Sequence, residues 1–166
     1  MNEREPAWLA KARSLVGRES RYVLACDAVN APMIRHWCEA FGFPLNWADT
    51  QPAPATMLQP WIFPGSSKER PPMSAAEDAT VAAQSAFAEG GFTGVVTANM
   101  DLEFLRTVVT GDRLAYTSEL ESISEEKKTG LGIGRFLGYR FTIVDADVRT
   151  VGVIKFTNLV YRPEVA

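Results

Sequence analysis

The sequence has few of the residues that build disulfide, metal and nucleic-acid sites. Its 166 residues include two cysteines, Cys26 and Cys38, and one histidine, His36. Two cysteines are too few for a disulfide scaffold, and the single histidine excludes a His/Cys zinc site of the usual spacing within one chain. The net charge of −3 argues against a nucleic-acid partner, which requires a clustered basic surface. We therefore expect no metal, no cofactor and no nucleic acid.

Long hydrophobic runs are also missing. No apolar stretch approaches the ~18–20 residues of a membrane helix, and the polar start MNEREP lacks the hydrophobic region of a signal peptide. The hydrophobic content of 46% and the charged content of 22% are ordinary for a globular protein. We expect a single cytoplasmic domain over residues 1–166 with no membrane partner.

The first half of the chain carries helical patterns. Met33, Trp37 and Phe41 repeat at four-residue spacing, which predicts a helix over Pro32–Phe41 with Asn30 as its cap. About two-thirds of its circumference is apolar, so we expect other elements to enclose it and Trp37 to be largely buried. Further helical stretches are predicted at Pro6–Val16, at Ala55–Trp61 as one or two turns, and at the Ala-rich Ser74–Glu89.

The second half of the chain changes to strand patterns. Leu131, Ile133, Leu137, Phe141 and Ile143 lie mostly two or four residues apart, the period of a strand. Turn residues separate the last three predicted strands, so these three should form an antiparallel meander. The predicted strands are Tyr22–Cys26, Phe92–Phe104, Asp112–Ser124, Gly130–Val144 and Val151–Tyr161. The fold class is therefore α+β, with an antiparallel sheet that curls around the Pro32–Phe41 helix.

Three stretches resemble a known family: VNAPMIRHWCEAFG, APATMLQPW and TGDRLAYTSELESISEEKKTGLGIGRF. They resemble the MaoC-like hydratases and dehydratases of acyl-coenzyme A (acyl-CoA) thioesters, and more narrowly the amino-terminal dehydratase-like domain of bacterial steroid side-chain hydratases. The resemblance covers Trp8–Pro60 and Phe92–Pro163. It implies the hot-dog fold, a curved antiparallel sheet wrapped around a central helix. It also implies a variable helical insertion around residues 65–90.

The resemblance locates a catalytic loop that is degenerate in this chain. Active members carry Gly-Asp-x-Asn-Pro-(aliphatic)-His after the helix, and the Asp and His exchange the protons of hydration. The matching segment here is Gly42, Phe43, Pro44, Leu45 and Asn46. Neither Asn nor Phe can exchange a proton near neutral pH, so the resemblance implies that this chain has no catalytic residue. Asp49 is the fallback, although it aligns with a loop carboxylate that is usually structural.

The resemblance also suggests residues that bind substrate. Met57, Leu58 and Trp61 lie in the segment that borders the acyl tunnel of the family, although core packing is the simpler role for them. Asn46 either bonds backbone within its loop or donates a hydrogen bond to a thioester carbonyl. His36 lies about ten positions before the catalytic slot, so we expect it to have a packing or surface role.

Three functions remain open from the sequence. The chain could be the silent subunit of an enoyl-CoA hydratase, where it shapes the acyl-CoA tunnel while another hot-dog chain supplies the Asp and His. It could instead be a self-sufficient homodimeric hydratase or thioesterase that uses Asp49 or Glu39. The third alternative is an acyl-thioester binding protein. In every case the expected partners are an acyl-CoA thioester and another hot-dog subunit, either a second copy or a catalytic relative.

Overall fold

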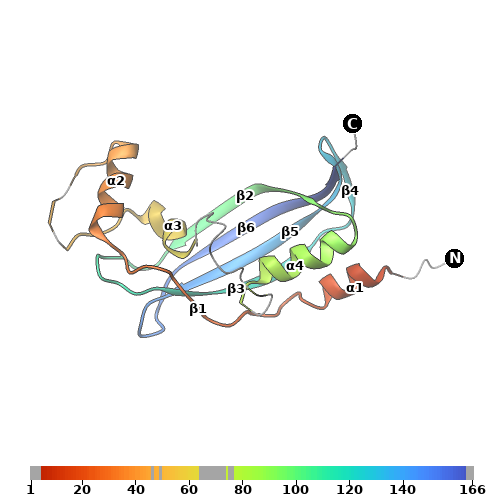
Figure 1. Ribbon diagram of the computed structural model, residues 1–166, viewed down its shortest axis with the longest axis horizontal. Helices are drawn as coiled ribbons and strands as arrows, with labels where there is room; N and C mark the ends of the chain where they lie inside the picture. Colours follow the sequence, from red (N-terminus) through yellow and green to blue (C-terminus); the bar gives the residue numbers. More distant parts are fainter. Residues whose placement is uncertain (1–4, 46, 49, 64–73, 75–76, 164–166) are drawn as a thin grey trace.

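The structure, a computed structural model, describes residues 5–45, 47–48, 50–63, 74 and 77–163. Its centre is one antiparallel sheet with the strand order β1–β3–β5–β6–β2, and β4 pairs with β5 (Figure 1). The strands are β1 (Val23–Leu24), β2 (Gly94–Phe104), β3 (Ala115–Ile123), β4 (Lys127–Thr129), β5 (Gly132–Val144) and β6 (Thr150–Pro163). The predicted antiparallel α+β class and the four late strands are confirmed.

The helices lie on one face of the sheet and at one end of it (Figure 1). They are α1 (Ala7–Arg13), α2 (Ala31–Phe41), the 3-10 turn η1 (Ala55–Met57), α3 (Leu58–Ile62) and α4 (Ala79–Glu89). None of the described helices has the length and apolar character to cross a membrane.

The helix that lies along the sheet is α4, not the predicted Pro32–Phe41 helix (Figure 1). The buried residues of α4 are Ala79, Ala82, Ala83, Ala86 and Phe87. Alanines allow the helix backbone to approach the sheet closely, while Phe87 fills the space toward α1. There its ring packs on Trp8 with 5.3 Å between centroids. The assignment of the central helix from the sequence was therefore wrong.

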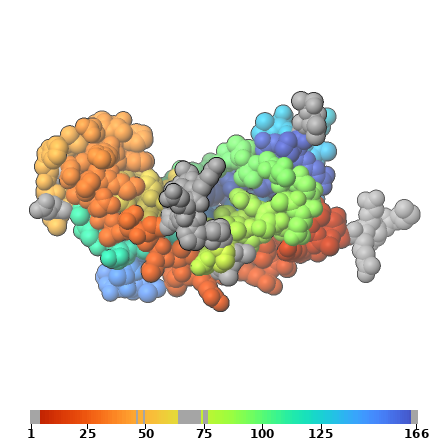
Figure 2. All heavy atoms as spheres, viewed as in Figure 1, coloured from red at the N-terminus to blue at the C-terminus, as the bar shows by residue number. Residues whose placement is uncertain are grey.

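The helix α2 forms in the predicted place but lies at the far end of the molecule (Figures 1 and 2). The side chain of Asn30 accepts a hydrogen bond from the Met33 amide at 3.0 Å, as expected of an N-cap. Only one side of α2 is enclosed, through Ile34 and Cys38. Trp37 is partly buried and stacks on Phe41, which is 63% exposed. The prediction that α2 is enclosed and that Trp37 is largely buried was wrong because no sheet covers this helix.

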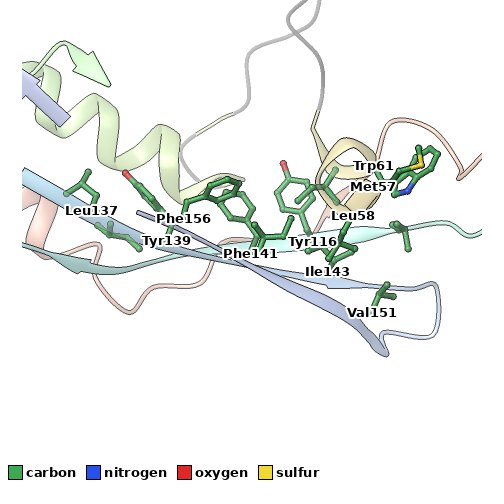
Figure 3. Close-up of a cluster of buried hydrophobic side chains, with 14 of the residues drawn as sticks. Met57, Leu58, Trp61, Tyr116, Leu137, Tyr139, Phe141, Ile143, Val151 and Phe156 are labelled. Carbon is green, nitrogen blue, oxygen red and sulfur yellow. The ribbon is translucent and has the colours of Figure 1, made fainter. Parts of the chain in front are cut away.

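The hydrophobic core lies between the sheet and the short helices (Figure 3). Alternate residues of β5 share one face of the sheet and are buried: Leu137, Tyr139, Phe141 and Ile143. The neighbouring strands add further buried aromatic side chains, and Phe141 packs edge-on against Phe156 of β6 at 5.5 Å. The helices α3 and α4 pack against this aromatic face of the sheet.

A tight turn with a buried carboxylate connects β5 and β6. Asp145 is nearly enclosed and accepts backbone N–H bonds from Asp147 and Arg149. It also pairs with the guanidinium groups of Arg149 and Arg106 at 3.1 and 3.3 Å. Burial raises the pKa of Asp145, but the two backbone N–H bonds and the charge of Arg149 outweigh it, so the pKa lies below its usual value.

This turn predicts a stability that depends on pH. Because the folded pKa of Asp145 is lower than the unfolded pKa, the carboxylate stabilises the fold above its unfolded pKa of ~3.9. The contribution is lost as the pH falls through the folded pKa. We expect Asp145→Asn to lower the melting temperature at pH 7, and the difference from wild type to narrow below about pH 4. The exposed Asp147→Asn is the control and should have a smaller effect. Thermal melts across pH test this, and a difference that did not vary with pH would contradict it.

Candidate functional site

A large cavity lies between α3, α4 and the aromatic face of the sheet. Its volume is about 560 Å³, within the range of small-molecule sites. The helices contribute Gln59 and Ile62 of α3, together with Thr80, Val81 and Gln84 of α4. Phe63 and Asp78 belong to the adjoining chain. The sheet contributes Val95, Thr97, Tyr116, Phe141, Phe156 and Asn158. The wall is mostly apolar, with a few polar side chains that can orient a ligand.

Asp78 is the carboxylate of this cavity. It is 8% exposed and caps the first turn of α4, where its Oδ1 accepts bonds from the Thr80 amide and hydroxyl. Burial, followed by the charge of Asp78, raises the pKa of the nearby Tyr139 hydroxyl far above its usual value. Tyr139 therefore stays protonated at neutral pH and cannot act as a base. Sequence reasoning missed Asp78, although an Asp before an Ala-rich helix is a cap signal.

The degenerate loop lies at a different place. Gly42 ends α2 in the left-handed conformation, with φ of 70°, and Phe43 and Leu45 are about half exposed. Phe43 and Pro44 line a second pocket of about 470 Å³ together with Cys38 and the segment from Gln51 to Thr56. This pocket and the 560 Å³ cavity share no lining residue. Asn46 and Asp49 lie outside the described residues, so their proposed roles stay predictions.

The three predicted tunnel residues are buried. Met57, Leu58 and Trp61 belong to the core cluster, and Leu58 and Trp61 border a third pocket of about 290 Å³ (Figure 3). None of the three lines the 560 Å³ cavity. The residues of α3 that do so are Gln59 and Ile62, spaced three apart on another side of the helix. A substrate contact by Met57, Leu58 or Trp61 stays a prediction.

The remaining candidate groups on α2 lie on the surface. His36 and Glu39 are exposed, and neither lines a described pocket. The expectation of a packing or surface role for His36 agrees with its position. Glu39 lies away from the cavity, which makes it unsuited to the catalytic role considered for a self-sufficient enzyme.

Two curated proteins are similar in sequence to this chain. The "Probable enoyl-CoA hydratase alpha subunit" of Thermomonospora curvata is 36% identical over 83% of this chain and 46% of its own length. The "3-oxo-4,17-pregnadiene-20-carboxyl-CoA hydratase alpha subunit" of Mycobacterium tuberculosis is 30% identical over 80% of this chain and 46% of its own length. The chain thus spans about half the length of these relatives. No protein-family model matches the sequence.

Solved structures agree on the fold. A chain of the ChsH1–ChsH2 complex from Mycobacterium tuberculosis superposes with a TM-score of 0.79 and 24% identity, over 96% of this chain and 93% of that chain. A MaoC-like dehydratase superposes with a TM-score of 0.50 and 17% identity, over 90% of this chain and 43% of that one.

The chain is similar in sequence to two hydratase alpha subunits and shares the hot-dog fold of MaoC-like dehydratases. The predicted resemblance and the hot-dog fold are thereby confirmed. In this chain the helix inside the curve of the sheet is α4, and α2 precedes the segment that the resemblance aligns with the catalytic loop.

Proposed function

We propose that this chain is the catalytically silent, alpha-type component of a MaoC-like enoyl-CoA hydratase. It contributes an acyl cavity, and a second hot-dog subunit contributes the Asp and His that exchange protons with the substrate. The observation that carries the proposal is the sequence of the segment Gly42–Asn46, where Phe43 follows the glycine and Asn46 stands in the position of the histidine. Hydration needs both groups within hydrogen-bond reach of one water, and neither Phe43 nor Asn46 can supply one.

The comparisons support the same assignment. Both curated relatives are named as alpha subunits of CoA-thioester hydratases, and one is named for a bulky pregnadiene carboxyl-CoA. The structural neighbour with a TM-score of 0.79 is a chain of a two-protein complex. The cavity of about 560 Å³ and its aromatic floor suit a large apolar acyl group. The test is to reconstitute hydration with a catalytic hot-dog partner, as set out in the Discussion.

The free edge of the sheet supports association with a second subunit. Strand β2 pairs with β6 on one side only among the described strands. It is eleven residues long and exposes Val95, Val96 and Met100. A long edge strand with exposed apolar side chains is a liability unless another element pairs with it or covers it.

We therefore expect the sheet of one subunit to continue into that of another through β2. Val96→Lys should shift the protein toward monomer, because charge on an edge strand opposes strand pairing. Val148→Lys is the matched control, since Val148 is also exposed but lies in the β5–β6 turn. Light scattering at micromolar concentration measures the change. The prediction is contradicted if the wild-type chain is a stable monomer both alone and when mixed with a catalytic hot-dog subunit.

One observation favours a second candidate, a self-sufficient homodimeric hydratase or thioesterase. Asp78 is a carboxylate that lines the 560 Å³ cavity, whereas Glu39 lines no described pocket. Its Oδ1 is engaged by Thr80 as a helix cap, which limits its use as a base. Turnover by the isolated chain that Asp78→Asn abolishes would select this alternative over the silent subunit.

A further inference from the structure

Asp78 is the one charged side chain among the described residues that line the 560 Å³ cavity. It is 8% exposed, so more than nine-tenths of it is buried. Its Oδ1 accepts the bonds from the amide and the hydroxyl of Thr80, whereas its Oδ2 has no hydrogen-bond partner among the described residues. Buried carboxylates are usually paired with a cation, because an isolated buried charge is costly. The described part of this cavity therefore carries an unbalanced negative charge.

The surroundings of Asp78 contain little that offsets this charge. The positive end of α4 already interacts with Oδ1 through the Thr80 amide. Arg18 and Arg21 line a different pocket, beside Ala79 and Ala82 of α4. No Lys, Arg or His is present in the described lining of the 560 Å³ cavity. An anion inside this cavity would face Asp78 without a cation to hold it.

The other polar side chains of the lining are neutral. They include Gln59 of α3, Gln84 of α4 and Thr97 of β2, which can each donate and accept hydrogen bonds. Such groups bind an uncharged oxygen as well as an anion, so they do not decide the charge of a ligand. The charge of Asp78 does, because like charges repel much more strongly in a partly buried site than in water.

We infer that Asp78 makes the cavity selective for acyl groups whose enclosed end is uncharged, and that it excludes acyl groups that end in a carboxylate. Asp78 is then a specificity-determining residue. The excluded class comprises thioesters of dicarboxylic acids, which carry a second carboxylate at the far end of the chain. The inference rests on the proposed function only in taking the occupant to be an acyl group.

The test uses three ligands that share a decyl chain and lack CoA, so that hydration does not enter the measurement. Calorimetric titration of the purified chain compares decan-1-ol, decanoate and decylamine, whose ends are neutral, anionic and cationic at neutral pH. We expect decanoate to bind at least about 10-fold more weakly than decan-1-ol. Asp78→Asn should bind decanoate about 10-fold more tightly than wild type does, and decylamine about 10-fold more weakly. Its affinity for decan-1-ol should stay within about threefold of the wild-type value, because no charge is involved.

The substitution separates selectivity from folding. Asparagine caps a helix as well as aspartate does, so Asp78→Asn keeps the first turn of α4. A purely structural role of Asp78 would not change the affinities for an anion and a cation in opposite directions. Glu89→Gln is the matched control, because it removes the same charge from the other end of α4, where Glu89 is exposed and lines no described cavity. It should leave all three affinities unchanged.

Three results would each overturn the inference. They are a failure of decan-1-ol to bind, equal binding of decanoate and decan-1-ol by the wild-type chain, and affinities for decanoate and decylamine that Asp78→Asn does not change. Failed reconstitution of hydration would overturn only the proposed function, since none of the three ligands undergoes that reaction.

Discussion

Purified alone, this chain is expected to hydrate an enoyl-CoA at least ~10²–10⁴-fold more slowly than a complex with a hot-dog subunit that carries an intact Asp/His loop. That factor is the usual cost of losing one positioned acid or base, and the family resemblance implies that both are replaced here. The segment Gly42–Leu45 offers no titratable side chain. Loss of the enoyl thioester absorbance measures the rate for the chain, the partner and the mixture.

Variants separate the roles of the two subunits. Asn46→His should not restore activity to the isolated chain, because the new imidazole lacks an Asp partner and the loop is two residues shorter than the family pattern. Replacing the Asp or His of the catalytic partner should abolish activity of the complex, whereas Asn46→Ala should change it little. Ordinary enzymatic turnover by the isolated chain would refute the silent subunit.

The largest expected effect on stability is at Phe87. Phe87→Ala should lower the free energy of unfolding by about 3–5 kcal/mol, the usual cost of removing a buried phenylalanine. The ring is 0% exposed and contacts Trp8 and Phe92 at 5.3 and 5.5 Å between centroids. Its loss leaves a cavity at the junction of α1, α4 and the start of β2. Denaturant titration measures the change.

Phe41→Ala is the matched control for this prediction. The same atoms are removed from α2, but Phe41 is 63% exposed, so little apolar area returns to water. We expect a loss of less than about 1 kcal/mol. The two results together test which helix belongs to the core. A larger loss at Phe41 than at Phe87 would mean that α2, and not α4, is the central helix.

The sequence pattern predicted the wrong central helix, because it favoured α2 over α4. The apolar residues of α2 include the large aromatic side chains of Trp37 and Phe41, and this pattern predicts an enclosed helix. Five of the eleven residues of α4 are alanine, and small side chains carry little weight in a hydrophobicity pattern. Yet a helix that is apolar on most sides is usually buried, and α4 buries Ala82, Ala83 and Ala86 against the sheet.

The sequence by itself determined the antiparallel strands, the cap at Asn30 and the end of α2 at Gly42. These features depend on alternation and on residue types within a few positions, which local physics fixes. The tertiary structure alone decided that α4 lies on the sheet and that Asp78 and Asn158 face one cavity. The register of β6 with β2 places Asn158 beside Thr97. Such pairing joins segments far apart in the chain, and no local pattern specifies which distant side chains will share a cavity.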